Sequence, residues 1–335
     1  MTEDLPWPPP RVIGRYPEAP GEGPTLVVFG GIHGNEPAGV FAARRVAARL
    51  AELAPPMRGQ FVALAGNRPA LARGVRFLDR DLNRAWTPAA LARLRDQGPD
   101  PAIAEEREQL EILTELGPLL ARRAPLTIFD MHTTSATGPP FCGMEDSPRN
   151  RRLAVHLPIP LIIGLDELVF GAMLAHLHRL GHTGVSIEAG EHDDPETVER
   201  LVSALWLLLC ALGLLAPQFV DGGLTRHRQR LVAATAGLPR VVDACYRHRI
   251  TPPEQFVMNP GHTTFSRVVR GQVIARDRDG PIAAPFTGRL LMPLYQPWGD
   301  DGFFLARELS RPRLWLANLL GIPLRRPGRL SRQPG

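Results

Sequence analysis

The chain has 335 residues, of which 44% are hydrophobic and 22% are charged, and its formal net charge is +5. These values are ordinary for a globular protein and allow one large domain and a smaller one. All 39 basic residues are arginines. Outside the C-terminal tail they are scattered and not interleaved with aromatic residues, so we expect no nucleic-acid partner. The three cysteines form no CxxC motif, which predicts no disulfide framework and favours a cytoplasmic location.

No segment is typical of export or of membrane insertion. The N-terminus is acidic and rich in proline, unlike a secretory signal. The most apolar run, residues 201–215, is about fifteen residues long, whereas a helix needs about twenty to cross a bilayer. Two aspartates and Pro195 precede this run as helix-start signals. We therefore expect a helix buried in the protein and no membrane partner.

Short apolar runs alternate with helical periodicity through the first two thirds of the chain. The predicted strands are residues 25–29, 60–65, 126–129, 160–163 and 184–187. The predicted helices are residues 37–53, 104–123, 172–179 and 201–215. This alternation predicts an α/β fold with a mixed, mostly parallel sheet flanked by helices on both faces.

The pattern of residues changes after residue 222. Short β-like runs broken by Gly and Pro follow, at residues 256–257, 264–269, 272–275, 288–292 and 302–306. They predict a smaller C-terminal all-β domain. We accordingly divide the chain into an α/β domain, residues 1–222, a β domain, residues 223–324, and a tail, residues 325–335, that we expect to be disordered.

Metal-binding side chains stand at the ends of three predicted strands. His33 and Glu36 share the loop after the first strand, and His132 follows a later one. Two imidazoles, one carboxylate and an open fourth position suit a catalytic zinc ion. Asp130 could orient the imidazole of His132 from outside the ligand set. Glu188, at the end of another strand, is then available as a general base.

A charged segment between these strands carries Arg76, Asn83 and Arg84. An arginine binds a carboxylate with two parallel hydrogen bonds and stays charged. Hydrolysis of an amide also needs a fixed donor for the oxygen that gains negative charge. These residues therefore predict the substrate half of a hydrolase site, with a solvated salt-bridge loop as the alternative.

Five motifs now indicate a family. GGIHGNEPAG, GNRPA, RFLDRDLNR, DMHTT and SIEAG, in this order, resemble the succinylglutamate desuccinylase/aspartoacylase family, whose members are zinc amidohydrolases similar to the zinc carboxypeptidases. The resemblance is clear over residues 25–215 and extends into the β region. It implies a carboxypeptidase-like fold, one zinc ion per chain, and hydrolysis of the amide bond of a small N-acyl amino acid.

The resemblance also implies a role for each matching residue. The zinc ligands would be His33, Glu36 and His132, the catalytic carboxylate Glu188, the residue that polarises the carbonyl Arg76, and the pair that binds the α-carboxylate Asn83 and Arg84. Where the family has an arginine that holds the acyl carboxylate, this chain has His178 with Arg179 beside it. Tyr295 is a loose match to a C-terminal tyrosine of the family, which adds it to the substrate-binding candidates.

Three other interpretations remain open at this point. The same ligands and the same Asn83–Arg84 pair would serve a metallocarboxypeptidase-like hydrolase. A catalytically silent protein could keep zinc and a carboxylate pocket for sensing, although the presence of Glu188 disfavours this interpretation. The β region could also dock a partner or a second copy of the chain, which leaves a homo-oligomer open.

Overall fold

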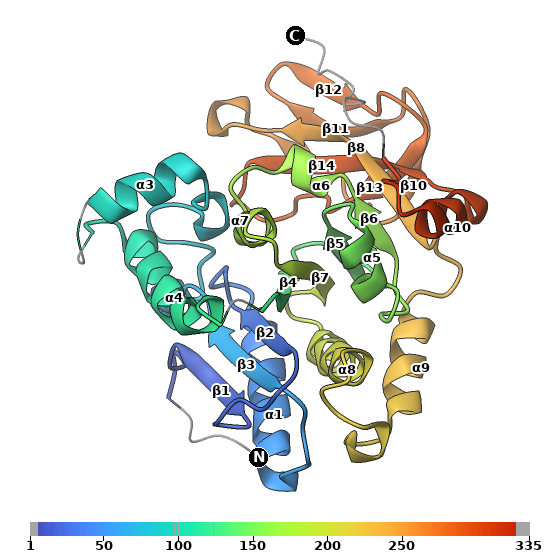
Figure 1. The fold of residues 1–335 in the computed structure, drawn as a ribbon. Coiled ribbons are helices and arrows are strands. Elements are labelled where there is room, and N and C mark those ends of the chain that lie inside the picture. The colour runs from blue at the N-terminus through green and yellow to red at the C-terminus, as the bar shows by residue number, and fades with distance from the viewer. Residues whose placement is uncertain (1–5, 97, 99–100, 123, 326–335) are drawn as a thin grey trace.

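The computed structural model describes residues 6–96, 98, 101–122 and 124–325. The predicted disordered tail therefore lies outside the described residues, apart from Arg325. One sheet of eleven strands runs through the molecule in the order β1-β3-β2-β4-β7-β5-β6-β8-β14-β13-β10, and a second sheet has the order β12-β11-β9 (Figure 1).

The elements up to the last helix of the α/β region are β1 (Val12–Tyr16), β2 (Thr25–Gly30), α1 (Ala38–Leu53), β3 (Gln60–Ala65), α2 (Arg68–Arg73), η1 (Leu82–Arg84), α3 (Pro88–Asp96), α4 (Ala104–Leu120), β4 (Leu126–Thr134), β5 (Phe141–Met144), α5 (Pro148–Ala154), β6 (Leu161–Ile163), α6 (Leu165–Leu168), α7 (Met173–Arg179), β7 (Thr183–Glu191) and α8 (Pro195–Ala211). The remaining elements are η2 (Pro217–Phe219), α9 (Leu224–Ala234), β8 (Val241–Arg249), η3 (Pro252–Glu254), β9 (Val257–Met258), β10 (Arg267–Val268), β11 (Val273–Asp277), β12 (Gly280–Ala283), β13 (Gly288–Leu291), β14 (Asp301–Glu308) and α10 (Arg311–Leu320).

The predicted α/β class is confirmed. Strands β3, β2, β4 and β7 are mutually parallel, as are β5, β6 and β8, and the two groups meet at the antiparallel pair β5–β7. Antiparallel strands close both edges of the sheet. Parallel strands place their carboxyl ends at one edge, which is where open α/β sheets bind ligands.

Helices cover both faces of the central strands (Figure 1). Because successive side chains of a strand point to opposite faces, β2 sends Leu26 and Val28 one way and Val27 and Phe29 the other. The first pair packs with α1 and α8, and the second pair packs with α3, α4 and α7. The predicted apolar helix therefore lies in the core as α8, and no helix among the described residues is long and apolar enough to cross a bilayer.

The strands after residue 222 extend the main sheet. β8 pairs with β6, and β14 pairs with β8, so backbone hydrogen bonds cross the predicted boundary between residues 222 and 223. The three-stranded sheet packs against β8, β13 and β14 in a shared apolar cluster that includes Ile274, Tyr246 and Phe303. Helices α9 and α10 add to the strands expected there. The division into two domains stays a prediction.

Two strands are longer than their apolar runs. The predicted strand at residues 126–129 continues as β4 through Thr134, and the strand at residues 184–187 continues as β7 through Glu191. The extension is possible because β4 and β7 are each other's neighbours and pair through their polar ends, with His132 opposite Glu188. Sequence alone also missed β1, which lies in the proline-rich N-terminal segment and forms one edge of the sheet by pairing with β3.

Candidate active site

The loop after β2 is held in place by close backbone packing. Gly34 donates its N–H to the carbonyl of Arg76 over 3.1 Å. A Cβ atom at Gly34 would lie 2.1 Å from the carbonyl carbon of Ala70, so α2 leaves no room for a side chain at this position. Glycine lets the loop press against α2, and the pressed loop presents His33 and Glu36 to the end of β4.

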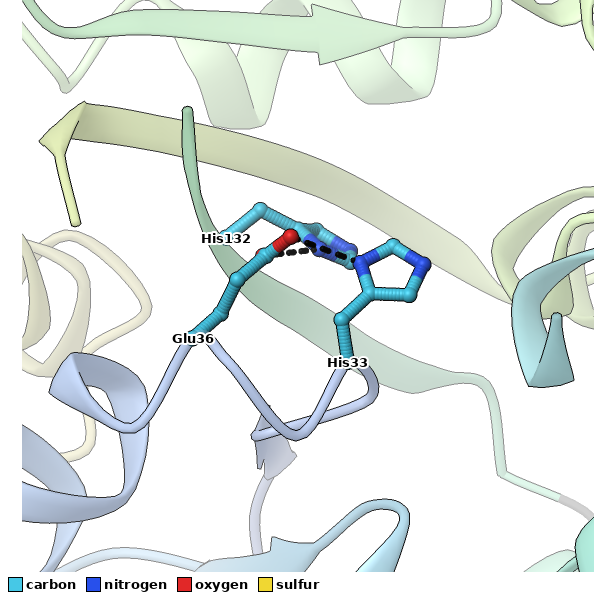
Figure 2. Close-up of side chains that lie close together, drawn as sticks. All are labelled: His33, Glu36 and His132. Atoms are coloured by element: carbon cyan, nitrogen blue, oxygen red, sulfur yellow. Dashed lines mark hydrogen bonds and ion pairs between the residues drawn. The ribbon is translucent and has the colours of Figure 1, made fainter. Parts of the chain in front are cut away.

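His33, Glu36 and His132 converge on one point, and all three are buried. Their candidate ligand atoms lie within 4.8 Å of one another. Nδ1 of His33 is 2.8 Å from Oε1 of Glu36, and Nδ1 of His132 is 3.0 Å from Oε2 of the same carboxylate. Figure 2 marks the contacts of the Glu36 carboxylate with both imidazole rings and shows Glu36 and His33 on the loop and His132 on the strand.

The outer nitrogen of each imidazole faces a carboxylate. Nε2 of His33 lies 3.1 Å from Oδ1 of Asp81, and Nε2 of His132 lies 3.0 Å from Oδ2 of Asp130. Imidazoles that ligate metals usually donate their second N–H to such a group, which fixes the ring and its tautomer. Both inner Nδ1 atoms are thereby left to face a common centre.

The electrostatics of this centre favour a cation. Burial alone would disfavour the charged form of His132, but Asp130 and Glu36 outweigh it and raise the pKa of His132 well above its usual range. Burial also works against ionisation of Glu36, yet the two imidazoles hold the pKa of Glu36 well below its usual range. The residues present therefore fit a divalent metal ion, and imidazole and carboxylate donors are those that zinc accepts.

Glu188 faces the same centre from the neighbouring strand. Its Oε2 atom is buried and has no hydrogen-bond partner among the described residues. Burial raises the pKa of Glu188 to about 8, and the negative charge of Glu36 adds to that effect. A buried carboxylate with one unpartnered oxygen is suited to accept and release a proton at a reacting atom.

Arg76, Asn83 and Arg84 line the same cavity. Arg76 lies 3.3 Å from Glu36 and 3.0 Å from Asp81, through separate guanidinium nitrogens. Asn83 accepts the N–H of Met173 on its Oδ1, which ties the 3-10 helix η1 to α7. Arg84 lies 3.0 Å from Asp301 of β14, so the C-terminal region fixes the position of this guanidinium.

The structure separates the three remaining substrate-binding candidates. His178 lines the cavity and pairs with Glu145, Nδ1 to Oε2, over 2.9 Å. Arg179 is exposed, donates to the carbonyl of Trp86, and is absent from the cavity wall. Tyr295 is also absent from the wall because its hydroxyl bonds to the backbone of residues 259 and 262. The geometry therefore retains His178 as a pocket residue and does not bring Arg179 or Tyr295 to the site.

The cavity has a volume of about 1280 Å³ including its open mouth. The connection between β13 and β14 supplies part of its wall, including Leu294, Gln296 and Trp298. Asn35, next to Glu36, donates to Gln296 over 3.0 Å, and the ring of Trp298 meets that of Phe77 edge-on. The C-terminal region thus closes one side of the site.

Sequence reasoning missed several residues of the site. Asp81 lies inside the RFLDRDLNR motif, where a carboxylate between arginines could have suggested an ion pair. Glu145 and Asp301 gave no such signal, because each meets its partner only through the tertiary fold. His192, by contrast, is a candidate for the edge of the pocket on sequence grounds, and its ring lies 2.6 Å from the hydroxyl of Thr133, next to His132.

Comparison with known proteins places this chain in a class of amidohydrolases. The sequence model of the succinylglutamate desuccinylase/aspartoacylase catalytic domain matches residues 22–201. An N-acyl-aromatic-L-amino acid amidohydrolase (carboxylate-forming) of Xenopus tropicalis is 32% identical over 266 residues, which cover 72% of this chain and 81% of that protein. The chain therefore belongs to the succinylglutamate desuccinylase/aspartoacylase family.

Solved structures agree at the level of the fold. A succinylglutamate desuccinylase/aspartoacylase from Rhodobacter sphaeroides superimposes with a TM-score of 0.61 at 20% identity, and the match covers 87% of each chain. Murine aminoacylase 3 superimposes with a TM-score of 0.57 at 18% identity, covering 87% of this chain and 97% of that one. Both matches extend beyond the 180 residues of the catalytic-domain match, so the likeness includes the C-terminal strands.

Proposed function

We propose that this protein is a zinc-dependent amidohydrolase that cleaves the amide bond of small N-acyl amino acids. Membership of the family supports this function, as do relatives whose names describe them as N-acyl amino acid amidohydrolases and a desuccinylase. The observation that carries the proposal is the convergence of His33, Glu36 and His132 in one cavity with the unpartnered oxygen of Glu188.

In this proposal His33, Glu36 and His132 hold one zinc ion per chain, and Asp81 and Asp130 orient the two imidazoles. Zinc bound there supplies a Lewis acid that polarises the scissile carbonyl and makes water a better nucleophile at neutral pH. The burial of all three ligands keeps bulk water from competing for their donor atoms.

Glu188 moves the proton. Its free Oε2 accepts a proton from the attacking water, and the resulting carboxylic acid returns that proton to the nitrogen of the leaving amino acid. The products are a carboxylic acid and a free amino acid.

Arg76 stabilises the carbonyl oxygen as it gains negative charge. Asp81 and Glu36 hold its terminal nitrogens, and its Nε is buried without a partner among the described residues. Loss of one such donor typically raises a hydrolytic barrier by about 2.7–4 kcal/mol. Asn83 and Arg84 bind the α-carboxylate of the substrate, which places the amide beside Glu188.

The β region limits the length of the substrate. The β13–β14 connection closes one side of the cavity, through Gln296 and Trp298 among others. We therefore expect compact N-acyl amino acids to enter and extended polypeptides to be excluded.

Amine release distinguishes this function from a carboxypeptidase-like one. The zinc-loaded protein would be given formyl, acetyl, succinyl and longer acyl forms of several amino acids, and in parallel peptides of about ten residues with free C-termini. We expect free amino acid from at least one N-acyl form and none from the peptides. Release from the peptides, with none from any N-acyl amino acid, would contradict the proposal.

A further inference from the structure

Helix α10 is apolar on its inner side and on its outer side. Leu314 and Ala317, three residues apart, lie on the inner side and pack against the core cluster that also contains residues of α5. Residues 315, 316, 319 and 320 lie on the other side and are exposed. A helix that is apolar all round is normally covered on every side. The described part of the chain leaves the outer side of α10 open to solvent.

The exposed apolar residues of α10 continue onto α5 as one patch. We define the α10 patch as Trp315, Leu316, Leu319, Leu320, Ile322 and Val155. Val155 directly follows α5 and lines a surface hollow together with Leu319 and Leu320. The side chain of Arg151 donates to the carbonyl of Ile322 over 2.8 Å, which fastens the end of α10 beside α5 at the periphery of the molecule (Figure 1). Contiguous apolar patches of this kind mark interaction surfaces.

The segments that carry the patch contain cationic residues and no acidic ones. Residues 147–165 and 309–335 together hold nine arginines and neither aspartate nor glutamate, whereas the whole chain has 39 basic and 34 acidic residues. Arg151 and Arg325 are buried and pair with Asp146 and Asp243. Arg152, by contrast, is exposed in the same hollow as Leu319, and Arg313 is exposed on α10 itself. The patch therefore has a cationic rim.

Charge decides which occupant fits this surface. In a symmetric dimer the same patch of each copy meets its counterpart, so both cationic rims would come together. Like charges placed opposite one another disfavour such a contact. A bilayer that contains anionic lipids attracts arginines instead, and tryptophan and leucine side chains are at home at its interface with water. Apolar patch and cationic rim together match an anionic lipid surface.

We propose that α10 binds the surface of anionic phospholipid bilayers. Trp315 and Leu319, each 65% exposed, enter the boundary between headgroups and acyl chains, and the arginines of the rim lie at the lipid phosphates. This proposal replaces the expectation of no membrane partner, which rested on the lack of a spanning segment. A helix of ten residues is too short to span and long enough to lie on the surface. The inference is independent of the proposed enzymatic function.

The test is flotation of the full-length protein with lipid vesicles. One set of vesicles is phosphatidylcholine alone, and the other contains about one quarter phosphatidylglycerol, which supplies the negative charge. Each set is run at low and at high salt concentration. We expect the protein to float with the anionic vesicles at low salt and to bind them at least tenfold more weakly at high salt, because salt screens the arginines. It should stay unbound with phosphatidylcholine alone.

Two variants separate the apolar face from the charge. Leu319→Gln should weaken binding to anionic vesicles about tenfold, since it removes an inserted leucine side chain. Arg152→Gln should weaken binding about fivefold, as expected for one arginine near the surface. The control is Val232→Gln on α9, a residue that is 48% exposed on another arginine-rich helix, and this variant should bind like wild type. Thermal unfolding verifies that all variants are folded.

Fluorescence locates the inserted side chain. The difference in emission between wild type and Trp315→Phe isolates Trp315 from the other four of the five tryptophans. We expect this difference spectrum to shift to shorter wavelength when anionic vesicles are added, because the indole ring leaves water. Val232→Gln should show the same shift as wild type.

Three results overturn the inference. The first is a protein that does not float with anionic vesicles at low salt, which leaves an acidic protein as the partner of the patch. The second is equal binding by Leu319→Gln and wild type, which would mean that charge alone attracts the protein. The third is a dimer, measured by light scattering, that Leu319→Gln dissociates while vesicles bind nothing, because the patch is then an interface between copies of this chain.

Discussion

Each imidazole at the candidate metal centre is held between two carboxylates. His132 has Glu36 on one ring nitrogen and Asp130 on the other, and His33 has Glu36 and Asp81. The inner carboxylate is shared, whereas each outer carboxylate serves one ring. We infer that the two outer carboxylates orient the imidazole rings, because a carboxylate that accepts the Nε2–H leaves Nδ1 as the ligand atom.

Asp130→Asn tests that task. Its amide can no longer attract a positive charge, so we expect the affinity for zinc to fall about 10- to 100-fold, the usual loss when such an outer partner is removed. Competition with a chelating indicator measures the affinity without any substrate. Asp279→Asn, at an exposed turn, should bind zinc like wild type. Equal affinity in Asp130→Asn and wild type would show that Asp130 does not support the ligand.

The elements position the site through close contacts that only glycine allows. At the end of β2, a Cβ atom on Gly30 would lie 2.4 Å from the carbonyl carbon of Gly39 in α1. That contact sets the distance between the strand and the helix that flank the His33–Glu36 loop. A Cβ atom on Gly117 in α4, by contrast, would have no neighbour within 4 Å among the described residues other than those next to it in the chain, and the backbone there is not strained. The next residue is Pro118, whose ring disfavours a helical backbone at a preceding residue that carries a Cβ atom.

Alanine at these two positions should therefore have effects of different size. Gly30→Ala forces β2 and α1 apart, and we expect it to lower the free energy of unfolding by about 1–3 kcal/mol. Gly117→Ala should change it by less than about 1 kcal/mol, because the lower conformational entropy that alanine loses in a helix is opposed by the contact of its Cβ atom with the ring of Pro118. Denaturant titration of both variants measures the difference. A Gly30→Ala protein as stable as wild type would contradict the close packing of β2 on α1.

At the scale of the whole molecule, one sheet joins both predicted domains, and Cys142 lies near its middle on β5. Its side chain is fully buried, and burial raises the pKa of its thiol to about 12. At pH 8 only about one molecule in ten thousand would carry the reactive thiolate. Cys210 and Cys245 are only partly buried.

We expect iodoacetamide to modify Cys142 far more slowly than Cys210 under native conditions, and at comparable rates in denaturant. Peptide mass spectrometry after timed quenching gives the rate at each cysteine. The rate at which Cys142 is modified in the folded protein should rise with pH until the protein unfolds, since the thiolate is the nucleophile. Modification of native Cys142 as fast as Cys210 would mean that β5 opens without global unfolding.

Sequence alone predicts the parts of this protein that local patterns encode. The apolar runs of β2, β3 and β4 and the periodicity of α1 and α4 fall at their observed positions, because burial on both faces leaves an unbroken hydrophobic signal. Strand β1 carries no such signal: it is an edge strand whose residues are only partly buried. Its pairing with β3 is a tertiary event.

The same distinction holds at the site. His33, Glu36, His132 and Glu188 follow apolar runs, so topology alone predicts that they meet. The pairs Asp81–His33, Glu145–His178 and Arg84–Asp301 join segments whose spacing carries no periodicity. The family resemblance predicts His178 as a substrate-binding residue but does not reveal its partner Glu145. It predicts Arg179 and Tyr295 from their positions in the chain alone, whereas in the structure Arg179 is exposed and the Tyr295 hydroxyl bonds to the backbone. Side-chain partners of this kind can be identified only from the tertiary structure.

The most direct test of the central claim compares wild type with Glu188→Gln for zinc content and for release of amino acid from the N-acyl panel. We predict about one zinc per chain in both proteins, because Glu188 is not a ligand. We predict a fall in kcat/KM of about 10²–10⁴ in the variant, the range that general acid–base catalysis contributes. A protein that binds no metal when zinc is supplied, or a variant that turns over as fast as wild type, would contradict the proposed function.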